Sequence, residues 1–513
     1  MTLVSKWKQT PWSWAAITLA VAVLERWIFW GLYAIKDYND TGTYRRLAGQ
    51  ILRGWSRYDG VRTPGYPLLL AWLGPDERVY VAQLALGIGI TLLMFWIGWM
   101  VSGKGWFAAL IGLAHTFNLG QLFFEASLMS ETLATFWVIL AVALTAAWIR
   151  HPGWRNGFAA LGIGLAAACA ALVRPLFLFL PVWLALVLAL VTLRGTRLRD
   201  WFRDATQRAE LGRLGLILLM PVVMIGSWAG FIHNQFGTWG VSTITGYHLI
   251  QHTGYYFEYV PDQYAKLRDT YIRYRDARIA RYGTQGNAIW DAIPEMTKVS
   301  GLSFNDLSDT LAKISIQLIR EHPDLYLHYA AEGWWLFWRA PVYWSADHLR
   351  APGLARPADG IILAERAAIF GANLFFLASS IGLLAWRKAR KRLRIGPILW
   401  LIAATVWVTS ILQTLPDHGD NPRFLIPMQS LVSVWVLWVA VQAGGWIRER
   451  PVHWTVRPPV PHHTCAAPQV QAGAGRTVND MKRCRASARG AYWGGFPRRA
   501  WEPGTRKNEN DAA

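Results

Sequence analysis

Long apolar segments recur along most of this chain and are separated by short polar connections. Each segment is about 20 residues long, which matches the thickness of the hydrocarbon core of a bilayer. The pattern predicts ten membrane-spanning helices near 11–35, 79–101, 106–124, 128–149, 156–173, 175–193, 212–233, 361–386, 395–415 and 424–447. We therefore expect an all-α polytopic membrane protein.

The composition agrees with this class. Of the 513 residues, 53% are hydrophobic and only 16% are charged, and 31 are Trp. An average soluble domain is less apolar and carries more charge. The first apolar segment is too long for the core of a signal peptide and lacks a small-residue cleavage site, so we expect an uncleaved signal anchor.

The formal charge of +20 is concentrated in the short connections between the apolar segments. The basic residues concerned are Lys6 and Lys8, Lys104, Arg150 and Arg155, the cluster within 194–213, and Arg387 to Arg394. With ten spans they all fall on one side of the membrane, which the positive-inside rule identifies as the cytoplasm. Both termini are then cytoplasmic, and this distribution argues against nucleic-acid binding.

The predicted spans divide the chain into four parts. They are an N-terminal membrane module of seven helices (1–233) with a first external loop (36–78), a mixed external loop domain (234–360), a C-terminal module of three helices (361–447) and a disordered, basic cytoplasmic tail (448–513). The Trp- and Tyr-rich segment 320–344 predicts a helix in the membrane interface. An eleventh span is the alternative, but it would place Glu332 and Arg339 at depth and invert every later loop.

The first external loop begins with an acidic pair, Asp37 and Asp40, directly after the first span. The residues that follow have helical character, with Leu47 and Ile51 four apart. A carboxylate held at the headgroup level can act as the general base for an acceptor hydroxyl that attacks a sugar, or can bind a divalent cation. The alternative is that Asp40 caps a helix that starts near Thr41.

Six short motifs occur in a characteristic order. They are DYNDTGTY (37–44), RTPGYP (62–67), SLMSETLATF (127–136), ALVRPLF (171–177), HNQFGTWGVST (233–243) and DNPRFLIP (420–427). In this order they resemble the polytopic GT-C-type glycosyltransferases, near the protein O-mannosyltransferase and aminoarabinose transferase group, which uses polyprenyl-phosphate sugars. The resemblance covers most of residues 20–445.

The resemblance implies roles for several acidic residues. Asp40 would be the catalytic base or a metal neighbour, and Glu131 the second acidic site, with Glu125 as the less favoured alternative. Asp37, Tyr44, Glu125 and Asp420 would support the site. Glu131 and Asp420 depart from the family pattern, which more often has Asp and Glu there, respectively. The resemblance implies no certain cofactor; Mg²⁺ or Mn²⁺ held by Asp40 and Glu131 is the candidate.

Arg174 and Arg423 lie on the predicted external side, against the positive-inside trend, and each is beside a proline. Arginine binds phosphate bidentately and can neutralise the charge of a departing polyprenyl phosphate. Arg62 is a weaker candidate for the same role. The alternative for all three is that they are interface anchors whose charged ends reach toward water.

The expected function is that of an inverting glycosyltransferase at the external face of the plasma (inner) membrane. The predicted cytoplasmic connections are too short to fold a nucleotide-binding domain, so a polyprenyl-phosphate-sugar donor and a lipid, glycan or protein acceptor should meet outside. Membrane lipids are the other expected partners, and nucleic acid is not expected to bind. A polyprenyl-lipid or polysaccharide transporter or flippase is the main alternative, and a membrane-bound assembly protein is the third.

The predicted orientation can be tested by labelling. A cysteine introduced at Asn287 should react with an impermeant reagent added to intact cells, because the loop that contains it is predicted to be external. The native Cys484 should stay protected until the membrane is permeabilised. The reverse pattern would contradict the orientation.

Overall fold

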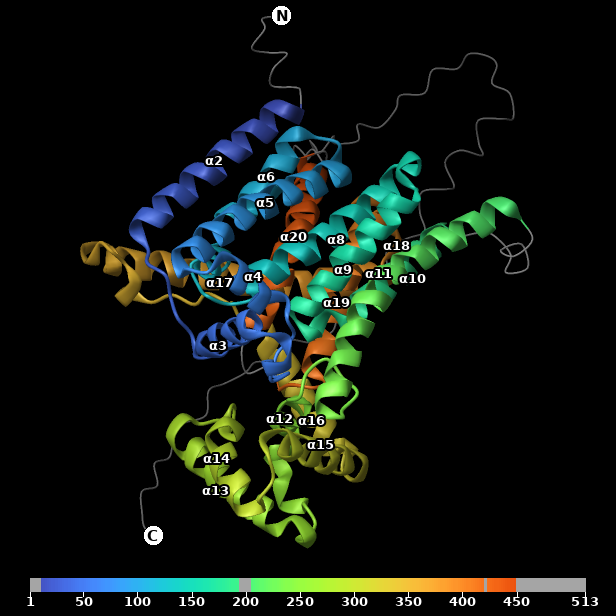
Figure 1. Cartoon of the computed structure of the whole chain (residues 1–513). Coiled ribbons are helices and arrows are strands. Elements are labelled where there is room, and N and C mark those ends of the chain that lie inside the picture. The colour runs from blue at the N-terminus through green and yellow to red at the C-terminus, as the bar shows by residue number, and fades with distance from the viewer. Residues whose placement is uncertain (1–10, 193–203, 419–421, 449–513) are drawn as a thin grey trace, which may run out of the picture. The chain divides into compact units, whose positions relative to one another are not determined.

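The computed structural model describes residues 11–192, 204–418 and 422–448 (Figure 1). Within these ranges the chain is helical, with two isolated β-bridges and no strand, which confirms the all-α class. The predicted tail beyond Arg448, the basic residues Lys6 and Lys8, and Asp420 lie outside the described residues.

Eight of the described helices are long and apolar enough to cross a membrane, and nine if one bent pair is counted as a single span. The eight are α2 (Pro11–Leu32), α5 (Asp76–Ser102), α8 (Glu131–Arg150), η3 with α10 (Pro175–Phe179, Leu180–Thr192), α11 (Ala205–Phe236), η7 with α17 (Pro352–Leu354, Ala355–Ala385), α19 (Pro397–Thr414) and η8 with α20 (Pro422–Leu425, Ile426–Arg448). The predicted span 156–173 coincides with α9 (Gly157–Val173), an apolar helix of only 17 residues. The chain is thus a multi-pass membrane protein by the length and composition of its helices.

The prediction of one continuous helix over 106–124 is wrong. The chain forms α6 (Gly105–Thr116) and α7 (Leu119–Glu125), bent by 57° at the break between them. Asn118 causes a new helix to start here, because its side-chain oxygen accepts a hydrogen bond from the backbone N–H of Gln121 at 3.1 Å. This is the usual capping function of an asparagine.

Two other boundaries differ from the prediction. The apolar residues before the second span form a separate helix, α4 (Gly65–Leu73), which ends where Gly74 takes a positive φ of 75° ahead of a proline. The seventh span starts earlier than expected, because Asp204 caps α11 by accepting a hydrogen bond from the Thr206 N–H at 2.7 Å. Part of the predicted cytoplasmic loop is therefore helical.

The interior of the bundle is built around α8. In its span 72% of the residues are buried, compared with 17% in α2, and α8 packs against α5, α9, α19 and α20. The outer helices α2, α10 and α11 keep apolar side chains exposed, which suits contact with lipid.

The segment between α11 and α17 folds into helices with an apolar core of their own. They are α12 (Thr245–Thr253), α13 (Ala265–Tyr282), α14 (Ala288–Ser300), α15 (Phe304–Glu321) and α16 (Pro323–Phe337). Figure 1 labels α12, α15 and α16 close together, and the three pack against one another. The predicted interfacial segment corresponds largely to α16, which also packs against α19.

The same helices hold the end of α19. The ring nitrogen Nε2 of His252 in α12 lies 2.6 Å from the carbonyl oxygen of Thr414. Gly333 in α16 contacts the backbone of His418 so closely that a Cβ there would lie 2.0 Å from the His418 oxygen. The end of α19 and the residues up to His418 are thus held by α12 and α16.

The buried His252 should make stability depend on pH. Burial and the nearby His418 lower the pKa of His252 from 6.5 to about 4, although Asp417 opposes the shift. Between pH 6.5 and pH 4, His252 is protonated in the unfolded chain but stays neutral in the folded chain. The free energy of unfolding should therefore fall as pH drops from 6.5 to 4, by at most about 3 kcal/mol.

His252→Gln keeps a donor for the Thr414 carbonyl but cannot titrate, so it should flatten the dependence of the unfolding temperature on pH between 7 and 5. His328→Gln, at an exposed position of α16, is the control and should leave the dependence unchanged. Equal slopes in wild type and His252→Gln would refute the assignment.

Candidate active site

Asp40 lies in the first turn of α3 (Asn39–Arg53), where a carboxylate is favoured by the helix dipole. The start of this helix is tied to the segment before α8. The Leu128 N–H donates to the Lys36 carbonyl at 3.2 Å, and Thr41 Oγ1 donates to the Leu128 carbonyl at 3.1 Å. These bonds place the N-termini of α3 and α8 side by side.

The carboxylate of Asp40 faces two arginines. Arg62 Nη2 donates to Oδ1 at 2.8 Å, and Arg423 Nη2 donates to Oδ2 at 2.7 Å. The alternative that Asp40 caps the helix is wrong, because Tyr38 occupies the N-cap position and its N–H donates to Thr41 Oγ1.

Glu131 is the first residue of α8, and its side chain is buried. Its Oε1 lies 2.7 Å from Arg174 Nη1 and 3.6 Å from Arg423 Nε. Arg174 is extended (φ −142°, ψ 119°) between α9 and η3, as expected for a residue before a proline. Arg423 therefore lies between the two carboxylates.

Arg62 is brought in by a close approach of two chain segments. Thr63 Oγ1 donates to the Val173 carbonyl at 3.3 Å. At Gly65 a Cβ would lie 2.7 Å from the Leu172 carbonyl oxygen, so a larger residue could not approach as closely. The loop that carries Arg62 is thus held against the end of α9, next to Arg174.

Phe424 completes this group, although no role was predicted for it from the sequence. Its ring centre lies 5.0 Å from Cζ of Arg174 and 5.5 Å from Cζ of Arg423, within the range of cation–π contacts. Its position directly after Arg423 was the available signal. We call the five charged residues of this site the charged cluster: Asp40, Arg62, Glu131, Arg174 and Arg423.

The arginines control the state of Asp40. Burial alone would raise the pKa of this carboxyl, but the charges of Arg62 and Arg423 outweigh burial and hold the pKa well below 3.8. Asp40 is therefore ionised at neutral pH and is a poor proton acceptor while both ion pairs persist. Glu131 Oε2 accepts no hydrogen bond from the described residues.

The charged cluster is a poor match for a divalent cation. Its two carboxylates already face three guanidinium groups, which would repel a metal ion. In the described ranges no group of three or more His, Cys, Asp or Glu side chains could hold a metal. Mg²⁺ or Mn²⁺ at Asp40 and Glu131 therefore remains a prediction that this arrangement does not favour.

Of the supporting residues predicted in the first loop, Tyr44 lies beside the charged cluster and Asp37 does not contact it. The Tyr44 hydroxyl donates to Ser130 Oγ at 3.1 Å, and its ring centre lies 5.9 Å from Cζ of Arg62. Asp37 is exposed and pairs with Arg45 at 2.6 Å.

Glu125 belongs to a different ion pair. Its carboxylate accepts two hydrogen bonds from Arg26 of α2, at 2.9 and 2.7 Å, and Arg26 also contacts Glu25 at 3.1 Å. These buried charges join α2 to α7 and do not contact Asp40. The sequence did not reveal the pairing, because 99 residues separate the partners.

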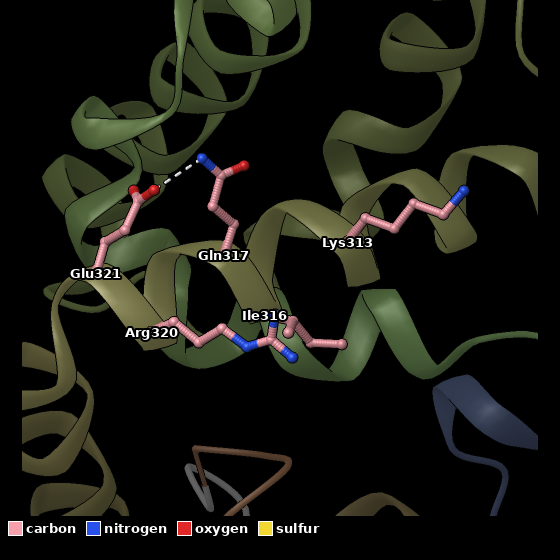
Figure 2. A pocket seen from close by; sticks show the side chains of 5 residues that line it. All are labelled: Lys313, Ile316, Gln317, Arg320 and Glu321. Carbon is pink, nitrogen blue, oxygen red and sulfur yellow. Dashed lines mark hydrogen bonds between the residues drawn. The ribbon is translucent and has the colours of Figure 1, made fainter.

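A surface depression lies on α15, in the helical segment between α11 and α17. Figure 2 shows an open depression along α15, lined by Lys313, Ile316, Gln317, Arg320 and Glu321. Gln317 Nε2 donates to Glu321 at 2.9 Å there. None of the predicted site residues lines this depression.

All five residues predicted for catalysis or phosphate binding thus lie together, whereas Asp37 and Glu125 lie apart and Asp420 is outside the described residues. No protein-family model, curated protein or solved structure matches this chain. The resemblance to GT-C-type glycosyltransferases therefore remains a prediction from the sequence motifs.

Proposed function

We propose that this chain is an inverting glycosyltransferase that moves a sugar from a polyprenyl-phosphate-linked donor to an acceptor at the external face of the membrane. The supporting observation is the charged cluster, in which a partly exposed carboxylate lies among three arginines. Proton removal needs a general base, which a carboxylate can supply, and a departing phosphate is stabilised by fixed positive charge. The charged cluster offers both.

Asp40 is the general base in this mechanism. The acceptor hydroxyl gives its proton to the Asp40 carboxylate while its oxygen attacks the anomeric carbon of the donor sugar. The bond from that carbon to the phosphate oxygen breaks, and the electron pair leaves with the polyprenyl phosphate. A single displacement of this kind inverts the anomeric configuration.

Arg174 and Arg423 stabilise the leaving group. Negative charge grows on the phosphate as the glycosidic bond breaks, and planar guanidinium groups can meet it with paired hydrogen bonds. Glu131 acts as a positioning residue, because it contacts both arginines from the buried side. Arg62 supplies a third positive charge from the first external loop.

The setting is consistent with a lipid-linked donor. A multi-pass helical bundle gives a polyprenyl chain direct access from the bilayer, while the acceptor can be a lipid, a glycan or a protein. We place the site at the external face of the plasma membrane on the distribution of basic residues in the short connections.

Purified protein in detergent should transfer sugar from at least one member of a panel of polyprenyl-phosphate sugars to water or to mixed acceptors. Asp40→Asn should lower turnover by roughly 10²- to 10⁴-fold, the usual contribution of a general base. Asp76→Asn is the matched control: Asp76 is also in a first helical turn and also pairs with an arginine, Arg45, but lies outside the charged cluster.

Retained turnover in Asp40→Asn would eliminate Asp40 as the base. If the wild-type protein converts no donor, the transporter alternative is favoured. In detergent there is no bilayer to cross, so the assay detects chemistry alone.

A further inference from the structure

Both oxygens of Asp40 are engaged by the groups that the proposed function needs for the donor. Arg62 and Arg423 each donate to one oxygen, at 2.8 and 2.7 Å. Each oxygen keeps a second lone pair, but the two guanidinium charges lower the basicity of the carboxylate, so in this state it is a poor acceptor for the proton of a hydroxyl. The described arrangement is therefore a resting state in which base and phosphate-binding groups neutralise each other.

Arg423 is placed so that it can exchange partners. Its Nη2 bonds Asp40, its Nε lies 3.6 Å from Glu131 Oε1, and its guanidinium lies against the ring of Phe424. Loss of the bond to Asp40 would leave Arg423 beside a second carboxylate and an aromatic ring, so the buried charge would not be stranded. Arg62, on its loop, has Asp40 as its only acidic partner in the described part of the chain.

We propose that the donor phosphate and Asp40 compete for Arg62 and Arg423, so that donor binding releases Asp40 to accept a proton. This regulation rests on the proposed function. It implies that donor binds first and that an acceptor hydroxyl is not activated at an empty donor site. A phosphate can satisfy both guanidinium groups with its own oxygens, which a single acceptor hydroxyl cannot.

Competition makes a prediction about affinity that simple catalysis does not. If Asp40 holds the two arginines in the resting state, then removing its charge should raise the affinity for phosphate, because binding no longer has to break those ion pairs. Hydrogen bonds between charged groups contribute about 1.5 to 3 kcal/mol, which corresponds to a gain of roughly tenfold or more.

The test measures binding of a sugar-free polyprenyl monophosphate to the full chain in detergent by calorimetry. Asp40→Asn should bind it roughly tenfold or more tightly than wild type. Asp76→Asn, which removes the same charge from another arginine-paired first turn, should match wild type. The corresponding polyprenyl alcohol should show no gain in any variant.

An Asp40→Asn protein that binds the phosphate no more tightly than Asp76→Asn would overturn the proposal, as would an equal gain for the alcohol. These readouts need no turnover, so they stand even if every donor fails as a substrate and the proposed function is wrong.

Wild-type kinetics give a second test that does not depend on the folding of a variant. If turnover is found, a non-reactive acceptor analogue should inhibit uncompetitively against the donor, because it binds only after the donor. Non-competitive inhibition would show that either substrate can bind first and would contradict the release of Asp40 by donor.

Discussion

The bridging position of Arg423 is the interaction on which the rest of the site depends. One guanidinium contacts Asp40 of α3 and Glu131 of α8, and Glu131 in turn contacts Arg174 at the end of α9. Buried charges are costly unless each has a partner, and removing one partner of a buried pair typically costs about 3 to 5 kcal/mol. The ion pairs therefore fix helix ends that are remote in the sequence.

Packing contacts are found on both sides of Arg423 along the chain. On one side, α12 and α16 hold the backbone around Thr414 and His418 through a buried histidine and a glycine contact. On the other side, Gln121 of α7 donates to the Ile426 carbonyl at 2.6 Å, just after η8. Thus α12 and α16 contact the end of α19, and α7 contacts the start of α20.

Hydropathy predicted most of the helices that are long and apolar enough to cross a membrane, because bilayer thickness imposes a length on each apolar segment. It did not predict the break at Asn118 or the separate helix α4, since side-chain capping and a glycine turn act within apolar segments without changing their mean hydropathy. Asp40, Arg174 and Arg423 were predictable as individual candidates from their places at span ends. Their pairing was not, since Asp40 and Arg423 are 383 residues apart and only tertiary packing joins them.

The most direct test of this account is a structure of the full chain bound to a non-hydrolysable phosphonate analogue of a polyprenyl-phosphate sugar. The account predicts phosphonate oxygens within hydrogen-bond distance of Arg423, Arg174 and Arg62. It also predicts an Asp40 carboxylate that has left Arg62 and Arg423 and faces the anomeric carbon. A phosphonate bound away from the charged cluster, or bound there while both ion pairs of Asp40 persist, would contradict it.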